Sequence, residues 1–157
     1  MAAKNKDLTS GLSATALKPL AAVIYAAAAD QDDKMMQYVG STVLNRLESG
    51  RKEFGAHNGS INEVIYQPGA YYEKSSNLFE EFMSGKFKDE KSKAKAMKAA
   101  STASALSRGT LDRMPGEFWF NAEEEAKLRK NPKAFNFKLV KKLGTVGNKN
   151  QFNTYGY

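Results

Sequence analysis

The sequence contains no cysteine and only one histidine, His57, in 157 residues. Without cysteine there is no disulfide bond, no thiolate zinc site and no cysteine nucleophile. A lone histidine cannot build a multi-histidine metal site, and a Ser-His-Asp triad would have to use that one residue. The side chains left for catalysis are carboxylates, tyrosine and lysine, and we expect neither a metal nor another cofactor.

Long hydrophobic runs are also absent. The longest, residues 20–29, has ten members and is mostly alanine, whereas a membrane-spanning helix needs about 20 apolar residues. We therefore expect no stable membrane insertion. Residues 1–7 lack the apolar core of a secretory signal peptide, so we expect synthesis in the cytoplasm.

Positive charge, in contrast, is abundant. There are 24 Lys and Arg against 17 Asp and Glu, a formal charge of +7, with basic clusters at residues 86–98 and 127–142. Such clusters are either solvated helix faces or a surface for a polyanion: nucleic acid, an anionic membrane surface or an anionic cell-wall polymer. Nucleic-acid binding favours aromatic side chains between the basic ones, and the first cluster offers only Phe87. We therefore expect no nucleic-acid partner.

Helical periodicity dominates the first two thirds of the chain. Apolar residues three and four positions apart predict a helix that begins near Ser13 or Thr15 and continues to Ala28. Asp32 and Asp33 are expected to cap the second helix. The same periodicity predicts further helices over residues 34–47, 77–84 and 88–106.

Less regular segments separate and follow these helices. Glycine and proline interrupt residues 55–75, which predicts a small loop or hairpin region with a short helix. The aromatic run at residues 117–121 predicts a strand or a buried loop. With no internal repeat, the sequence predicts a polar N-terminal arm (residues 1–13) followed by one predominantly α-helical α+β domain (residues 14–157).

Four blocks of sequence, in order and spacing, resemble the cell-wall hydrolase family typified by the SleB/CwlJ-like spore-cortex lytic enzymes, with relatives in phages. The blocks are residues 20–29 with 40–50 (Gly-Ser-Thr-Val-Leu-Asn-Arg, then Ser-Gly), 64–71 (Val-Ile-Tyr-Gln-Pro-Gly-Ala-Tyr), 103–109 with 118–121 (Phe-Trp-Phe-Asn), and 147–152 (Gly-Asn-Lys-Asn-Gln-Phe). The resemblance covers roughly residues 17–155. It implies a lysozyme-like single domain that acts on the glycan strands of peptidoglycan.

One departure from the family pattern concerns the chemistry itself. The family has its catalytic Glu two residues after the Tyr of the first block, and here that position is Ala27. A second acidic position of the family falls on Gln31, and the His of the last block falls on Lys149. Glycosidic cleavage needs a carboxylic acid to protonate the leaving oxygen, and a methyl group cannot do so.

Two accounts of Ala27 follow from this departure. It is either an inactivating replacement of the glutamate, which Ala27→Glu would reverse, or the mark of a natural pseudoenzyme that keeps the groove for binding. Glu73, just after the second block, is the alternative candidate for the catalytic acid.

The resemblance also implies a set of substrate-binding residues: Gln67, Tyr71, Tyr72, Asn121 and Tyr155. Aromatic rings would stack on pyranose faces, and the amides would bond sugar hydroxyl or N-acetyl groups. Tyr71 equally suits core packing, and Asn121 suits a turn. Arg46 is interpreted as structural, bonding carbonyl groups or an acidic neighbour, and Trp119 as a core residue.

The sequence thus predicts a monomeric peptidoglycan-degrading lysin that cleaves between N-acetylmuramic acid and N-acetylglucosamine, as a lytic transglycosylase or muramidase. Lacking a signal peptide, it suits a phage product that reaches the bacterial cell wall by holin-type release or in the virion. The alternatives are a non-catalytic glycan-binding or virion structural protein of the same fold, a peptide-stem amidase or endopeptidase, and a basic nucleic-acid-binding module.

Overall fold

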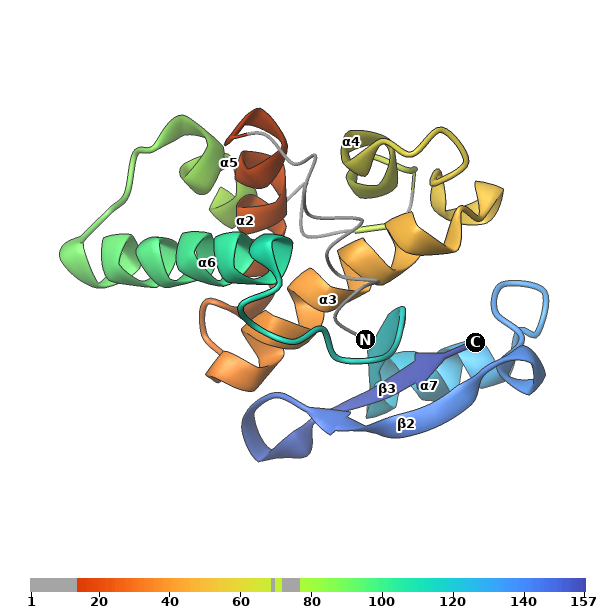
Figure 1. Ribbon diagram of the computed structural model, residues 1–157. Coiled ribbons are helices and arrows are strands. Elements are labelled where there is room, and N and C mark those ends of the chain that lie inside the picture. The colour runs from red at the N-terminus through yellow and green to blue at the C-terminus, as the bar shows by residue number, and fades with distance from the viewer. Residues whose placement is uncertain (1–13, 69, 72–76) are drawn as a thin grey trace.

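The chain folds as a group of packed helices followed by a small antiparallel sheet (Figure 1). The computed structural model describes residues 14–68, 70–71 and 77–157, so the predicted N-terminal arm lies outside the described residues. The helices are α2 (Ala14–Ala28), α3 (Asp33–Ser49), α4 (Ile61–Ile65), α5 (Asn77–Ser84), α6 (Glu90–Arg108) and α7 (Ala122–Arg129). The strands are β1 (Phe118–Asn121), β2 (Lys141–Val146) and β3 (Phe152–Gly156), and short 3-10 turns are η1 (Lys52–Phe54), η3 (Phe137–Leu139) and η4 (Asn148–Asn150). The predicted helix-rich α+β class is confirmed.

Helix α2 forms the centre of the helical part. Its residues 20–25 are all nearly inaccessible to solvent, with at most 3% exposure. A helix that is apolar on every side needs neighbours on every side, and α2 packs against α3, α5 and α6 (Figure 1). Among the described residues, no helix is both long and apolar enough to cross a bilayer.

Helix α3 separates this helical group from the sheet and α7 (Figure 1). Asp32 caps it as predicted, accepting a hydrogen bond from the Met35 amide at 2.9 Å. Asp33 is instead the first helical residue, and its carboxylate pairs with Lys98 of α6. Within α3, Gly40 permits close packing, because a Cβ there would lie 2.5 Å from Leu106 Cδ1 and 2.9 Å from Ile24 Cδ1.

The sheet has the order β1-β3-β2, so the last strand in sequence is the central one. Both pairings are antiparallel, with Trp119 opposite Thr154 and Val146 opposite Phe152. The hairpin allowed for around residues 55–75 is not found in the described part of that stretch, which forms turns and α4. The reason is local: Ser60 caps α4 through the Glu63 amide, and Ile61, Val64 and Ile65 bury one helical face.

Candidate active site

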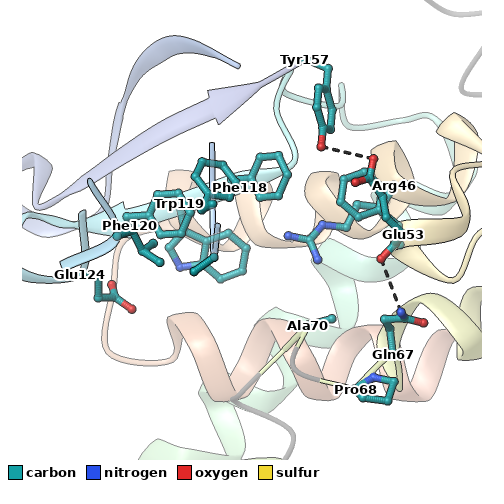
Figure 2. A pocket seen from close by; sticks show the side chains of 14 residues that line it. Arg46, Glu53, Gln67, Pro68, Ala70, Phe118, Trp119, Phe120, Glu124 and Tyr157 are labelled. Atoms are coloured by element: carbon teal, nitrogen blue, oxygen red, sulfur yellow. Dashed lines mark hydrogen bonds between the residues drawn. The ribbon is translucent and has the colours of Figure 1, made fainter. Parts of the chain in front are cut away.

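A cavity of about 520 Å³ opens between η1, the segment after α4, β1 and α7 (Figure 2). Aromatic rings supply much of its wall, and two carboxylates, an amide and a guanidinium add polar groups. The lining residues are Arg46, Glu53, Phe54, Gln67, Pro68, Ala70, Phe118, Trp119, Phe120, Glu124, Leu128, Ala134, Phe135 and Tyr157. Such a mixture of flat apolar surface and convergent polar groups is typical of ligand sites.

The aromatic wall is held in place by polar side chains of α3. Asn45 Nδ2 donates to the carbonyl oxygens of Met114 and Gly116, each at 2.8 Å. Tyr38 Oη donates to the Phe118 carbonyl at 2.6 Å, and its burial raises the pKa of this phenol. These bonds fix the segment that leads into β1, so the rings that follow it have a defined position.

Alternation along β1 divides its aromatic side chains between two faces. Phe118 and Phe120 lie on one face with nearly parallel rings, and both meet Phe135 edge-on. Trp119 points the other way, toward Tyr38 and Tyr71. All three residues of the run nevertheless border the cavity.

Arg46 lies where η1, β1 and the cavity meet. It is only 7% exposed, and its Nε and Nη2 donate to the Glu117 carbonyl at 2.9 and 2.6 Å. Its guanidinium also faces the rings of Phe54, Tyr71 and Phe118, with centroids 4.8, 4.8 and 5.2 Å away. The predicted bonding of Arg46 to a carbonyl group is confirmed.

The two cavity carboxylates are both open to solvent and already bonded. Glu53, whose side chain is 51% exposed, accepts from Arg51 at 2.9 Å and from Tyr157 Oη at 3.2 Å. Glu124 is exposed, and its carboxylate accepts from the Asn121 amide at 2.9 Å, within the capping box that starts α7. Both carboxylates are therefore already engaged by neighbouring groups of the protein.

Ala27, the position that the resemblance assigns to the catalytic acid, lies one residue before the end of α2. The Tyr of the first block, Tyr25, points toward α5: its hydroxyl donates to Glu81 at 2.5 Å, and burial, followed by Glu81, raises its pKa to about 12. Two residues further on, a helix has turned about 200°, so Ala27 faces away from α5. The described residues that line the cavity all come from outside α2.

The structure places the other predicted site residues in different roles. Gln67 borders the cavity and donates to the Glu53 carbonyl at 3.4 Å. Tyr71 is 1% exposed, bonded to Thr42 Oγ1 at 3.1 Å, beneath Arg46. Asn121 caps α7, accepting from the Glu124 amide. Tyr72 and Glu73 lie outside the described residues.

Tyr155, a residue of the central strand β3, is buried. Its hydroxyl donates to Glu125 at 2.7 Å and accepts from Arg129 at 3.2 Å. It therefore braces α7 against β3, and the cavity lining among the described residues does not include it. The substrate-binding roles implied by the resemblance stay predictions for all of these residues.

Several cavity residues had no signal in the sequence. Tyr157 and Glu53 meet across 104 positions of sequence, and no local pattern reports such a pairing. The position of Glu124 is typical of an acidic residue in the first turn of a helix, so the sequence does not mark it as a site residue. Phe118 and Phe120, in contrast, belong to an aromatic run that stands out, although the sequence did not show that this run borders a cavity.

Comparison with known families identifies the class of protein. The family model described as Cell Wall Hydrolase matches residues 30–150, which is most of the chain. This chain therefore belongs to the cell wall hydrolase family, which supports a general function in degrading peptidoglycan. The matched region begins three residues after Ala27. No curated protein matches the chain, and no solved structure does.

Proposed function

We propose that this chain is a glycan-cleaving cell wall hydrolase in which Ala27 occupies the place of the catalytic acid. The observation that carries the glycan-binding part of this proposal is the open cavity of about 520 Å³ whose wall is built from Phe118, Trp119 and Phe120. The assignment of Ala27 comes from the family pattern of the sequence, since none of the described lining residues belongs to α2. Flat rings suit the faces of pyranose sugars, and the polar groups at the rim suit their hydroxyl and N-acetyl substituents. The bond cleaved is the one between N-acetylmuramic acid and N-acetylglucosamine.

The reaction requires one acid that also serves as a base. A carboxylic acid donates its proton to the glycosidic oxygen as that bond breaks and positive charge develops on the sugar ring. In a lytic transglycosylase, the resulting carboxylate then removes the proton of the 6-hydroxyl of the same sugar. That oxygen closes onto the anomeric carbon and leaves an anhydro product without the entry of water.

Glu53 and Glu124 do not fit this role, because both are exposed and already accept hydrogen bonds. Loss of a general acid lowers rates by about 10²- to 10⁴-fold. We therefore expect the chain with Ala27 to bind peptidoglycan glycan strands and to cleave them at least about 100-fold more slowly than its Ala27→Glu variant.

The test compares this chain with Ala27→Glu on purified sacculi, with the soluble products identified by mass spectrometry. Release of anhydromuropeptides by Ala27→Glu alone is the expected result, whereas reducing-end products would indicate a lysozyme-type hydrolase instead. The matched control is Ala26→Glu, which adds the same group one residue away on the same partly buried helix end. Equal activity of the starting chain and Ala27→Glu would transfer the acid role to another residue, with Glu73 examined next.

A second candidate is a non-catalytic glycan-binding or virion structural protein of the same fold, which Ala27 itself favours. Its distinguishing result is tight, saturable binding to sacculi with no soluble product from either variant, while circular dichroism shows both variants folded.

A further inference from the structure

We propose that Arg46 is an anion-binding residue in the cavity and that it receives a carboxylate group of peptidoglycan. This inference rests on the proposed function, because it assumes that the cavity holds a glycan strand. It adds a charge preference to the site: the ligand presents an acidic group to the cavity in addition to neutral sugar surfaces.

The first observation is that Arg46 is buried and that the described residues supply no acidic partner for it. It makes no ion pair with any carboxylate in the part of the chain that the structure describes. Arg113 provides the contrast, since its equally inaccessible side chain is paired with Glu48 at 3.0 Å. A buried charge normally has a counterion, because removing it from water is costly.

The second observation concerns Nη1, the guanidinium nitrogen of Arg46 that donates no hydrogen bond to the described residues. Nε and Nη2 both donate to the Glu117 carbonyl, and three aromatic rings partly replace the lost hydration. Nη1 has no acceptor among the described residues. It is not sealed off either, because every fully buried side-chain nitrogen and oxygen in the described residues has a partner. Figure 2 shows the guanidinium pointing into the open space of the cavity.

These two observations define the ligand group. A guanidinium with a fixed plane and a free N–H is suited to a carboxylate, and its rigid anchoring means that little entropy is lost on binding. Sugars of the N-acetylglucosamine type are neutral, so they cannot supply this group. In peptidoglycan a carboxylate comes either from the lactyl group of a muramic acid without a stem peptide or from the stem peptide itself.

The experiment is calorimetric titration of the unmodified chain with three probes of equal glycan length. These are a neutral oligomer of N-acetylglucosamine, a peptide-free strand of alternating N-acetylglucosamine and N-acetylmuramic acid, and the same strand carrying stem peptides. We expect an acidic strand to bind roughly 10- to 100-fold more tightly than the neutral oligomer, the range of one charge-assisted hydrogen bond. Comparison of the two acidic strands identifies the source of the carboxylate. Tighter binding of the peptide-free strand indicates the lactyl group, and tighter binding of the strand with stem peptides indicates the peptide.

The variants Arg46→Gln and Arg46→Lys then test the residue. Arg46→Gln is expected to bind all three probes with similar affinity, and Arg46→Lys to keep part of the preference through its remaining charge. The control Lys91→Gln removes the same charge from an exposed site on α6 and should keep the full preference. Because Arg46 also anchors β1, Trp119 fluorescence and thermal melts must show that each variant is folded.

The outcomes separate the two proposals. Equal binding of neutral and acidic strands by the unmodified chain would overturn the role of Arg46 and leave the glycan cleft intact. An acidic preference that survives in folded Arg46→Gln would overturn it as well. Failure to bind any of the three probes would contradict the proposed function.

Discussion

At the scale of single residues, polar side chains of α3 do much to position the site. Ser41 Oγ accepts a hydrogen bond from the Met114 amide at 3.0 Å. Asn45 Nδ2 donates to the carbonyl oxygens of Met114 and Gly116. A second network joins α7 to the sheet, where Glu125 accepts from Tyr155, Arg129 and Asn153. In both places a buried or half-buried polar group has its partners supplied by another element, which fixes one arrangement.

The network around Glu125 predicts a pH dependence. Burial alone would raise the pKa of Glu125, but the hydrogen bonds from Tyr155, Arg129 and Asn153 outweigh it, and the pKa lies below its ordinary value. A carboxyl whose pKa is lower in the folded state than in the unfolded chain stabilises the fold above the unfolded pKa, about 4.3 for Glu. This contribution is lost as the pH falls through the folded-state pKa.

We therefore expect Glu125→Gln to reduce the free energy of unfolding at pH 7 and to reduce it less at pH 3. Urea denaturation at both pH values measures the difference. The control Glu123→Gln alters a carboxylate on the same helix whose pairing with Lys127 is largely exposed, so it should change stability little at either pH. A deficit of Glu125→Gln that is the same at both pH values would contradict the role given to the charged form.

At the scale of elements, the turn between α6 and β1 determines where the aromatic wall stands. Gly116 has φ +121°, a conformation that L-residues rarely adopt, and a Cβ there would collide with the hydroxyl of Tyr38. The Gly116 carbonyl also accepts from Asn45. The turn therefore needs glycine both for its backbone and for the space beside it.

Gly116→Ala is expected to lower the free energy of unfolding by about 2–5 kcal/mol, combining backbone strain with overpacking. Gly50→Ala is the comparison, since Gly50 has φ +66° but nothing within 4 Å of the added Cβ. It should cost only about 1–2 kcal/mol. Urea denaturation followed by Trp119 fluorescence measures both variants, and equal losses would show that contact with Tyr38 contributes nothing.

At the scale of the whole molecule, the sheet depends on its central strand. Both β1 and β2 pair with β3, and they do not pair with each other. The helices α2, α3, α5 and α6 pack together without the sheet. The molecule thus combines a helical group with a sheet whose order depends on one strand.

Removal of residues 152–157 is expected to abolish the sheet and to expose Trp119, while most of the helical signal remains. Far-ultraviolet circular dichroism reports the helices, and the emission maximum of the single tryptophan reports β1. Removal of Tyr157 alone is the control, because all β1–β3 and β2–β3 partners stay in place. An unshifted tryptophan emission after the larger deletion would contradict the dependence of β1 on β3.

The sequence predicted the parts of this fold that have a local signal. The apolar spacing in α2, α3, α5 and α6 gave each of these helices to within about two residues, an accuracy set by fraying ends. It gave no signal for α7, which has no fully buried residue. The N-cap of this helix, Asn121, was interpreted as a sugar-binding residue. The strand β3 lies in a segment rich in glycine and asparagine. It pairs both with its neighbour in sequence, β2, and with β1 about 30 residues earlier, a pairing that local sequence does not report.

The candidate site was predictable to a smaller extent. Gln67 was identified and does border the cavity. Tyr71 belongs to the same block, but its side chain is buried and packs beneath the guanidinium of Arg46. Arg46 was expected to bond carbonyl groups or an acidic neighbour, and it bonds a carbonyl oxygen. Which of its nitrogens has no acceptor among the described residues depends on the folded arrangement, which spacing along the chain does not report.

The strand order has a consequence for biosynthesis. A ribosome delivers residues in sequence, and domains begin to fold from the N-terminal side as they emerge. Helices α2 to α6 can assemble while the rest is being translated, but β1 waits for β3, which is made about 30 residues later. The nascent chain therefore carries Phe118, Trp119 and Phe120 exposed until translation has passed residue 156. During that interval the aromatic run is open to chaperone binding, and the cavity that it lines does not yet exist.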